Sequence, residues 1–465
     1  MENRFNLLTS KEWLPFQKSW SVPDSSDHLY LENLRFFTLP SIEPKMVYYY
    51  GPKIESFRSA ASSIGIKVSD QAVEPIQFGM IDIRSEIRTA AKQEDLLRVH
   101  SLVDDLISAT KQHLIDRRFL CVLAQNVEIN GALIPVAWDI GKLLAKHLSL
   151  KDEKILCGER DASSKLFGSE VEYALYARRD DAESHSTEAT WLLKSFLGRS
   201  VKPNRSAEIS KWFVLKPPPR KKGEVLHPAK YPESLAEAFI RAYSEPGSNV
   251  IDPMSGTGST QLAAVASGRN GYGTELSPFF AELAVGRLTE YSDPAQATLF
   301  PTENTSGTFR IVNADARDIP ILDFPSIDYA CTSPPYWDML NMKGAENQAR
   351  RIEQGLQTNY STDGADLGNI ADYSRFLDEL TDVYLAMFKI MKPESYFTFV
   401  VKNIKKQGAA YPLAWDLTHR LLPYATPVAE HFWLQDDLSI APYGYGNTWV
   451  SNTFHQYCIT VQLKT

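Results

Sequence analysis

The chain has 465 residues, enough for two or three domains, and is 43% hydrophobic, 11% aromatic and 23% charged. Without an apolar run of about 18 residues, a membrane-spanning helix is excluded. The 49 Lys and Arg residues against 57 Asp and Glu residues give a net charge of −8, which excludes a protein that coats polyanions unspecifically. Cys121, Cys157, Cys331 and Cys458 form no CxxC pair, and no secretory signal is evident, so we expect a cytoplasmic protein without disulfides or a cysteine zinc site.

Helix-like and strand-like patterns alternate from residue 226 onward, as in an α/β unit. The predicted order is a helix over 234–243, a strand over 249–251, a helix over 261–266, a strand over 271–275, a helix over 279–288, strands over 310–313 and 327–331, a helix over 373–391 and a strand over 396–401. Polar or glycine-rich residues follow the carboxyl end of each of the first four strands, where open parallel sheets bind ligands. The sequence therefore predicts a doubly wound, Rossmann-like sheet with one ligand crevice.

A glycine turn follows the first of these strands. It reads Asp252-Pro253-Met254-Ser255-Gly256-Thr257-Gly258-Ser259-Thr260. Glycines at a strand-to-helix turn let a ligand approach backbone amides and the helix N-terminus, and Glu275, which ends the next strand, can accept hydrogen bonds from ribose hydroxyls. These features favour a nucleoside cofactor, although such turns also serve helix–sheet packing alone. The chain has no GxxxxGK[ST] motif, which disfavours an ATPase.

A proline corner follows the fourth strand, with the sequence Thr332-Ser333-Pro334-Pro335-Tyr336-Trp337. The two prolines fix an extended main chain and lack N–H donors, so nearby carbonyls can accept from a substrate amine. Ser333 adds a hydroxyl beside that amine, and Tyr336 offers a flat face on which a base can stack. The alternative is a proline-rich turn with a packed aromatic ring.

The chain also resembles itself. Residues 119–140 align with residues 396–417 without a gap, and Asn126, Gly131, Pro135, Ala137, Trp138 and Asp139 then fall on Asn403, Gly408, Pro412, Ala414, Trp415 and Asp416. We interpret residues 1–200 as a degenerate duplicate of the catalytic half and residues 201–465 as the catalytic domain. The N-terminal copy lacks a turn like that at Gly256, and its nearest counterpart to Ser333–Tyr336 is the poor match Tyr50-Gly51-Pro52-Lys53. We expect this copy not to be catalytic.

Together with His227-Pro228-Ala229-Lys230-Tyr231-Pro232-Glu233, these motifs resemble the amino-group (N4/N6) DNA methyltransferases that use S-adenosylmethionine, over about residues 226–465. The resemblance implies that the base is held by Ser333, Pro334, Pro335 and Tyr336. It implies that the cofactor is bound by His227, Pro228, Lys230, Asp252, Pro253, Gly256, Thr257, Gly258, Ser259, Thr260, Glu275 and Asp315. A serine in first place of the tetrapeptide is typical of enzymes acting on the cytosine amine, and adenine is the alternative base.

The expected reaction needs no covalent nucleophile and no metal. Methylation of cytosine carbon 5 usually needs a thiolate after a proline, and no cysteine here follows one. The nine histidines show no HxxxH or HExxH spacing, so no metal site is predicted. A target base inside a duplex has to be flipped out to reach such a site.

The resemblance implies double-stranded DNA as partner and is compatible with a restriction or defence partner. It leaves the oligomeric state open, a homodimer included. The usual order for this chemistry places the Ser-Pro-Pro-Tyr half first, whereas here the glycine turn precedes Ser333, as tandem fusion of a permuted enzyme would leave it. With no separate target-recognition domain evident, we expect DNA contacts from the N-terminal region, the basic segment 202–230 and the loop 338–370.

Two other functions stay open from the sequence: an RNA base methyltransferase, and a non-catalytic binding or scaffold protein with a relic pocket. Weaker site candidates are Asp436-Asp437 with the loop 442–446, and Lys402-Asn403, Trp415 and Asp416. For this last group a structural role is equally compatible with the sequence, because Asn126, Trp138 and Asp139 recur in the copy without a catalytic motif.

Overall fold

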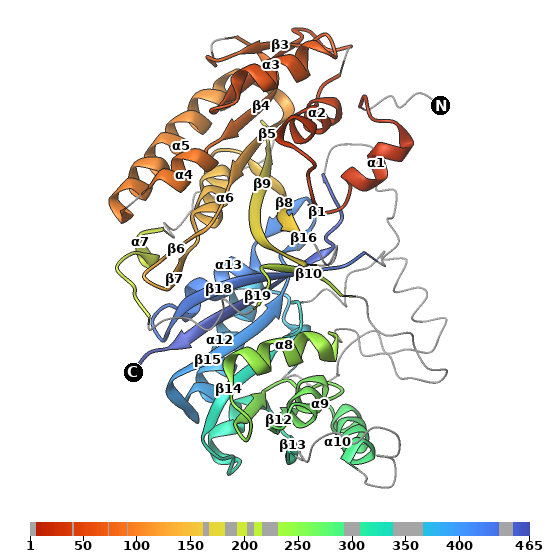
Figure 1. Ribbon diagram of the computed structural model, residues 1–465, viewed down its shortest axis with the longest axis vertical. Helices are drawn as coiled ribbons and strands as arrows, with labels where there is room; N and C mark the ends of the chain where they lie inside the picture. The colour runs from red at the N-terminus through yellow and green to blue at the C-terminus, as the bar shows by residue number, and fades with distance from the viewer. Residues whose placement is uncertain are drawn as a thin grey trace.

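A computed structural model of the chain describes residues 6–39, 41–72, 74–90, 92–160, 167–181, 193–201, 209–215, 231–292, 307–337, 366–436 and 450–465. Fifteen strands form one sheet, in the order β13-β12-β11-β14-β15-β19-β18-β10-β9-β5-β4-β2-β3, with β8 paired to β9 and β1 paired to β8. The sheet runs along the length of the molecule, with β3 at one end, β18 and β19 near the middle, and β12 and β13 at the other end (Figure 1).

The C-terminal strand set comprises β11 (Asn249–Asp252), β12 (Asn270–Glu275), β13 (Phe309–Asn313), β14 (Ile327–Thr332), β15 (Met391–Val401), β18 (Ala425–Leu434) and β19 (His455–Leu463). β13, β12, β11, β14 and β15 pair in parallel, and β19 is antiparallel to both β15 and β18. The strand order reverses between β11 and β14, because β12 and β13 lie on one side and β15 on the other. Such a switch point is where ligands bind in open α/β sheets.

The N-terminal strand set comprises β2 (Met46–Tyr50), β3 (Lys67–Ser69), β4 (Ile76–Asp82), β5 (Leu114–Ala124), β8 (Ser149–Arg160) and β9 (Phe167–Arg178). Its order β3-β2-β4-β5-β9-β8 matches β12-β11-β14-β15-β19-β18 strand for strand, with the same parallel and antiparallel pairings. The short strand β10 (Trp212–Val214) bridges the sets by pairing with β18 and β9, and β1 (Trp20–Ser21) extends β8.

Local backbone details repeat in the same alignment that relates the two sequence copies. Each set carries a small hairpin after its long parallel strand: β6 (Val127–Ile129) with β7 (Ala132–Ile134), and β16 (Ile404–Lys406) with β17 (Ala409–Tyr411). Both hairpin turns end in a glycine with positive φ, Gly131 at 74° and Gly408 at 81°, which a residue with a side chain rarely adopts. Arg117 and Glu394, which the alignment also pairs, share φ values of 61° and 59°. The two sets are therefore alike in backbone as well as in sequence.

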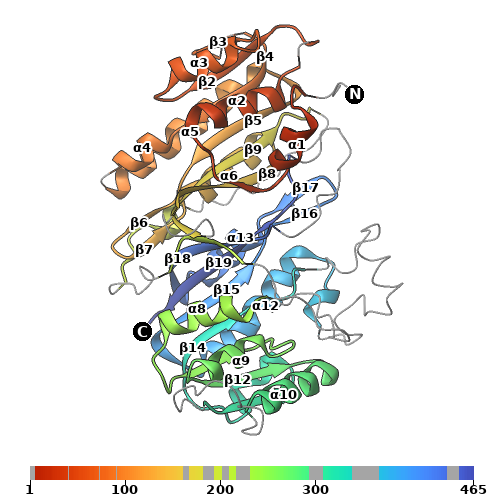
Figure 2. The same ribbon diagram turned by 45° about the vertical axis from the view of Figure 1, so that its right-hand side comes forward.

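Helices cover both faces of the sheet, as in a doubly wound fold (Figures 1 and 2). They are α1 (Ser10–Phe16), α2 (Ser26–Phe37), α3 (Ile54–Ser62), α4 (Arg84–Thr89), α5 (Gln93–His113), α6 (Val136–His147), α7 (Leu193–Phe196), α8 (Glu233–Tyr243), α9 (Ser259–Ala266), α10 (Pro278–Ser292), α12 (Tyr373–Phe388) and α13 (Leu413–Leu421), with 3-10 turns η2 (Ala316–Ile321) and η4 (Leu367–Asn369). In β14, Tyr329 and Cys331 pack with α8 and α9, whereas Ala330 belongs to the core that contains α12. This alternation buries both faces of the strand.

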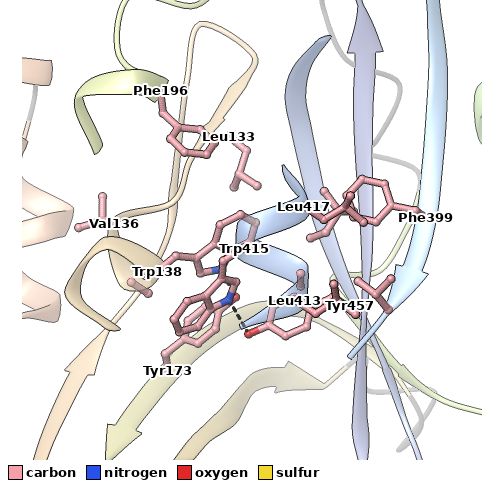
Figure 3. Close-up of a cluster of buried hydrophobic side chains, with 14 of the residues drawn as sticks. Leu133, Val136, Trp138, Tyr173, Phe196, Phe399, Leu413, Trp415, Leu417 and Tyr457 are labelled. Atoms are coloured by element: carbon pink, nitrogen blue, oxygen red, sulfur yellow. Dashed lines mark hydrogen bonds between the residues drawn. The ribbon is translucent and has the colours of Figure 1, made fainter. Parts of the chain in front are cut away.

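One hydrophobic core runs through both strand sets. It includes Trp138 of α6 and Trp415 of α13, whose rings stack with centroids 6.3 Å apart and an interplanar angle of 12°. Figure 3 shows the two indoles lying against each other at the centre of this cluster. Gly141 permits the contact, because a Cβ there would lie 2.5 Å from the Trp415 ring. The two sets thus pack through equivalent helices.

The α/β doubly wound prediction is confirmed, and the predicted helices and strands around the crevice match α8 to β15 with small shifts at their ends. One pairing was wrong: Tyr50–Lys53 is not the counterpart of Ser333–Tyr336. It follows β2, which takes the place of β11, whereas β4 takes the place of β14. The registers of β4 with β5 and of β14 with β15 place Asp82 where Ser333 stands in the C-terminal set. No helix in the described ranges is long and apolar enough to cross a membrane.

Candidate functional site

The glycine turn and the proline corner meet at the switch point of the C-terminal set. They follow β11 and β14, which are neighbours in the sheet. Asp252, the last residue of β11, accepts a 2.6 Å hydrogen bond from the hydroxyl of Thr332, the last residue of β14. Thr260, at the start of α9, donates to the other carboxylate oxygen of Asp252 at 2.6 Å. The two motifs therefore line one crevice.

Asp252 organises this junction. Its side chain is 1% exposed and also accepts from the backbone N–H of Met254 at 3.0 Å, which shapes the turn. Burial raises the pKa of the Asp252 carboxyl, against the lowering effect of the hydrogen bonds from Thr260 and Thr332. With its oxygens occupied by protein donors, Asp252 acts on the shape of the turn.

The turn itself depends on glycine. Gly256 has φ 53° and Gly258, which precedes α9, has φ 77°, both in the left-handed region. The Thr257 carbonyl accepts from the Arg287 guanidinium, and Arg287 also forms a 2.7 Å ion pair with Glu233. The result is a turn fixed by these contacts at the N-terminus of α9.

Glu275 lies at the carboxyl end of β12, beside the turn. Its carboxylate accepts from the N–H of Gly256 at 2.8 Å and of Ser277 at 2.9 Å. Burial, reinforced by the nearby carboxylates of Asp252 and Asp366, raises the pKa of Glu275 to about 7, against the lowering effect of the two N–H donors. Hydroxyl groups that donate to this carboxylate stabilise its ionised form, because each hydrogen bond favours the charged state.

Ser333 and Tyr336 of the proline corner contact β15 and β19. The Ser333 hydroxyl donates to the carbonyl of Val400 on β15 at 3.1 Å and lies 3.2 Å from the Tyr336 hydroxyl, which donates to Gln456 at the start of β19. The Lys402 ammonium lies 5.2 Å from the centre of the Tyr336 ring. Burial raises the pKa of Tyr336 and lowers that of Lys402.

Asp315, Pro253 and Ser259, which were also predicted as site residues, make contacts of their own within the protein. Asp315, after β13, is bound by the Arg317 guanidinium, and Arg317 in turn bonds to Glu379 of α12. Burial raises the pKa of Asp315, but the Arg317 contacts outweigh this effect and leave it lowered. Pro253 accepts from Thr274 through its carbonyl at 2.7 Å, and Ser259 lies 3.3 Å from Glu233.

Several predicted residues lie outside the described ranges. They are His227, Pro228 and Lys230, most of the basic segment 202–230, almost all of the loop 338–370, Asp437 and the loop 442–446. Asp436 is described and pairs with Lys18. Of the weaker candidates, Lys402 lies beside Tyr336, whereas Asn403, Trp415 and Asp416 contact the N-terminal set. Within the described parts of the chain, no three His, Cys, Asp or Glu side chains gather as metal ligands.

Tyr384 is a residue that the sequence did not single out. It belongs to α12, and its pKa is raised by burial and by the charges of Asp252 and Tyr336. Its buried hydroxyl has no hydrogen-bond partner among the residues described. Such a group next to both motifs is compatible with a site built for a polar ligand. Only its helical periodicity was visible in the sequence, and that indicates a core position.

The corresponding crevice of the N-terminal set is occupied by ion pairs. Asp82, at the position of Ser333, is bound by Arg84 at 2.7 Å, and Arg84 also pairs with Glu172 of β9. Tyr30 donates to the same Asp82 carboxylate at 2.9 Å. A cavity of about 250 Å³ remains beside these residues. The serine of the C-terminal corner is thus replaced by a carboxylate that Arg84 and Tyr30 bind.

Comparison with known proteins gives one family. A family model described as DNA methylase matches residues 89–286, less than half of the chain, and spans α5 to α10 with the glycine turn. The matched region runs from the second half of the N-terminal set to the glycine turn and α10, and it stops before Ser333.

Relatives include the orphan methyltransferase M.BamHII of Bacillus amyloliquefaciens, 42% identical over 65 residues, which are 14% of this chain and 24% of that protein. The DNA adenine methyltransferase YhdJ of Escherichia coli is 39% identical over 62 residues, 13% of this chain and 21% of YhdJ. The type II methyltransferase M2.LlaDCHI of Lactococcus lactis is 24% identical over 198 residues, 40% of this chain and 71% of that protein. The chain thus spans about a quarter or less of the first relatives it matches.

Solved structures also align with the chain. An rRNA methylase from Streptococcus thermophilus covers 51% of this chain and 99% of its own, at 8% identity and a TM-score of 0.30.

Proposed function

We propose that the chain is an N4/N6 DNA methylase that transfers a methyl group from S-adenosylmethionine to the exocyclic amine of a flipped-out cytosine in double-stranded DNA. The observation that supports this most strongly is the hydrogen bond between Asp252 and Thr332, which joins the glycine turn to the proline corner at the switch point. A cofactor at the first motif and a base at the second would face each other across this junction.

The residues present fit the cofactor. Gly256 and Gly258 keep side chains away from the turn at the N-terminus of α9, and Glu275, which binds the Gly256 N–H, offers its carboxylate to ribose hydroxyls. Asp315 extends the same edge at the end of β13, although its bonds to Arg317 leave less of it free for the adenine. In this proposal Asp252 shapes the turn that receives S-adenosylmethionine. The cofactor is held by the described residues Pro253, Gly256, Thr257, Gly258, Ser259, Thr260, Glu275 and Asp315, together with His227, Pro228 and Lys230.

The chemistry depends on alignment. The bound cofactor supplies a methyl group already activated on a sulfonium. Ser333 directs its hydrogen to the Val400 carbonyl, so its lone pairs are free to accept an N–H of the base, as is the Pro334 carbonyl. The nitrogen–carbon bond forms as the sulfur–carbon bond breaks, and the nitrogen then loses one proton to solvent water. Positioning supplies most of the rate in such a reaction.

Tyr336 provides the stacking surface for the base, and Pro335 fixes its approach. The Tyr336 hydroxyl is held by Gln456, so the ring orientation is set before the base arrives. Flipping the base out of the duplex costs on the order of a few kcal/mol, and stacking on an aromatic ring returns about 1–3 kcal/mol.

Adenine is the second candidate base, favoured by the relative named as a DNA adenine methyltransferase. Cytosine is preferred because a serine, not an aspartate or asparagine, occupies the first place of Ser333–Tyr336.

We propose that residues 1–200 form a degenerate, non-catalytic methyltransferase-like module and residues 201–465 the catalytic domain. Asp82 stands at the position of Ser333 and is bound by Arg84 and Tyr30, so a paired carboxylate replaces the serine hydroxyl there. The DNA contacts are assigned to this module, to the segment 202–230 and to the loop 338–370.

Methylation of matched DNA and RNA duplexes with radiolabelled S-adenosylmethionine tests the proposed function. The proposal expects label in DNA and a much lower rate of labelling after Ser333→Ala. Label in RNA alone would overturn the assignment of substrate, and calorimetry without S-adenosylmethionine binding would favour a relic pocket instead.

A further inference from the structure

We propose that Glu153, from the N-terminal module, is a positioning residue for the base side of the C-terminal site. The inference rests on the proposed function, since it assigns a part in that reaction to the non-catalytic module. Glu153 belongs to β8 and is buried between the two modules.

Glu153 binds three residues of the catalytic domain. Its carboxylate accepts from the Asn403 amide at 2.8 Å and from the Tyr457 hydroxyl at 2.7 Å, and it lies 3.2 Å from Nε2 of His455. Its neighbour Asp152 accepts from the Lys405 ammonium and from the backbone N–H of Ser451 at 2.6 Å. Two adjacent carboxylates therefore hold the loop after β15 and the start of β19.

These two segments carry the surroundings of Tyr336. Lys402, which lies over the Tyr336 ring, directly precedes Asn403. Gln456, which accepts from the Tyr336 hydroxyl, directly follows His455. Because neighbouring side chains of a strand point to opposite faces, His455 can face Glu153 while Gln456 faces Tyr336. A change at Glu153 is thus transmitted to the base corner through a single residue on each segment.

Equivalent contacts occur in the other half of the interface, which is related to the first by approximate two-fold symmetry. Glu430 of β18, which the alignment of the two copies pairs with Glu153, accepts from Asn126 at 2.9 Å and from Tyr173 at 2.6 Å. Tyr173 and Tyr457 each accept from a core indole, Trp138 at 3.1 Å and Trp415 at 3.2 Å respectively. Each module thus gives a glutamate to the other, as in a two-fold symmetric dimer interface.

The two halves of this interface differ at two positions, those of His455 and Lys405. The strand registers show that Val171 of β9 is equivalent to His455 of β19. The alignment of the two copies shows that Glu128 is equivalent to Lys405. His455 and Lys405 thus add contacts on the side that carries Ser333 and Tyr336, as a positioning role requires.

Glu430, the equivalent of Glu153 in the other half of the interface, supplies the control. Glu153→Gln and Glu430→Gln each replace a buried carboxylate that accepts from an asparagine and a tyrosine, so both changes perturb the interface in a comparable way. Of the two glutamates, Glu153 is the one that bonds directly to the segments beside Tyr336. We expect Glu153→Gln to lower kcat on duplex DNA by about 10- to 100-fold and Glu430→Gln to change it by less than about three-fold, because misplacing a reacting group by about 1 Å can cost 100-fold. Both variants should keep the S-adenosylmethionine Kd of the unmodified chain.

Hydrogen exchange of the whole chain gives a second readout that does not depend on turnover. Faster exchange at residues 402–404 and 455–457 in Glu153→Gln, and not in Glu430→Gln, is expected. Equal losses of activity in the two variants, or unchanged exchange at both segments in Glu153→Gln, would overturn the positioning role. If the unmodified chain methylates no DNA, the proposed function fails, and the exchange comparison still decides whether Glu153 organises this corner.

Discussion

Replacing Glu275 by glutamine probes the cofactor side of the crevice without changing the size of the side chain. Glu275 is a largely buried carboxyl that accepts two backbone N–H bonds, and its pKa is raised from 4.5 to about 7, with burial as the largest cause. Since one pKa unit corresponds to about 1.4 kcal/mol, this difference amounts to about 3 kcal/mol.

The sign of the effect follows from proton binding. Between the pKa of the unfolded chain and that of the folded chain, the folded state holds a proton that the unfolded state has released. The stabilising contribution of Glu275 to the free energy of unfolding is thus fully present below a pH of about 4.5 and is lost as the pH rises through about 7. From about pH 5 to about pH 8, the free energy of unfolding of the unmodified chain should fall by about 3 kcal/mol relative to Glu275→Gln.

Urea unfolding of both proteins across this pH range measures the difference. S-adenosylmethionine binding supplies an independent check, because ribose hydroxyls favour the ionised carboxylate. The Kd of the unmodified chain should therefore improve as the pH rises through about 7, and that of Glu275→Gln should be weaker and insensitive to pH. Parallel stability curves for the two proteins would refute the reasoning about Glu275.

Three further changes test other parts of the account. Ser333→Ala should lower kcat by about 100-fold, the scale of losing one positioned hydrogen-bonding group, while calorimetry finds the S-adenosylmethionine Kd unchanged; an equal loss of cofactor affinity would contradict a base-side role. Asp252→Asn places an N–H donor against the hydroxyls of Thr260 and Thr332, so it should weaken S-adenosylmethionine binding by about ten-fold or more; an unchanged Kd would show that the turn does not depend on this carboxylate. Gly141→Ala puts a Cβ 2.5 Å from the Trp415 ring and should lower the free energy of unfolding by about 1–3 kcal/mol; a more stable variant would contradict the packing of α6 on α13.

The sequence predicts the crevice well because its signals are local. The strands over 249–251 and 271–275 and the turn at Gly256 are encoded by β-branched residues, glycines and acids within a few positions, and β11, β12 and α9 form there. Each element ends on the same edge of a parallel sheet, so the meeting of Asp252 and Ser333 follows from topology.

The relation between the modules was less visible. The ungapped repeat stops before β9 and β19, because Tyr173 and Tyr457 hold equivalent places in the two strands but do not fall on each other when the repeat is extended without a gap. Comparison of the amino-acid sequences alone paired Tyr50–Lys53 with the proline corner. The strand registers instead identify Asp82 as the equivalent of Ser333. The role of Glu153 depends on contacts with residues far along the chain, Asn403 and Tyr457, which no local pattern encodes.

Long-read modification mapping tests the central claim most directly, in DNA from a host that expresses either the unmodified chain or Ser333→Ala. It reports the modified base and its surrounding sequence together. The account predicts N4-methylcytosine in a defined sequence context with the unmodified chain and its absence with Ser333→Ala. N6-methyladenine in its place would contradict the choice of base, and unmodified DNA in both hosts would contradict the assignment of a DNA methyltransferase.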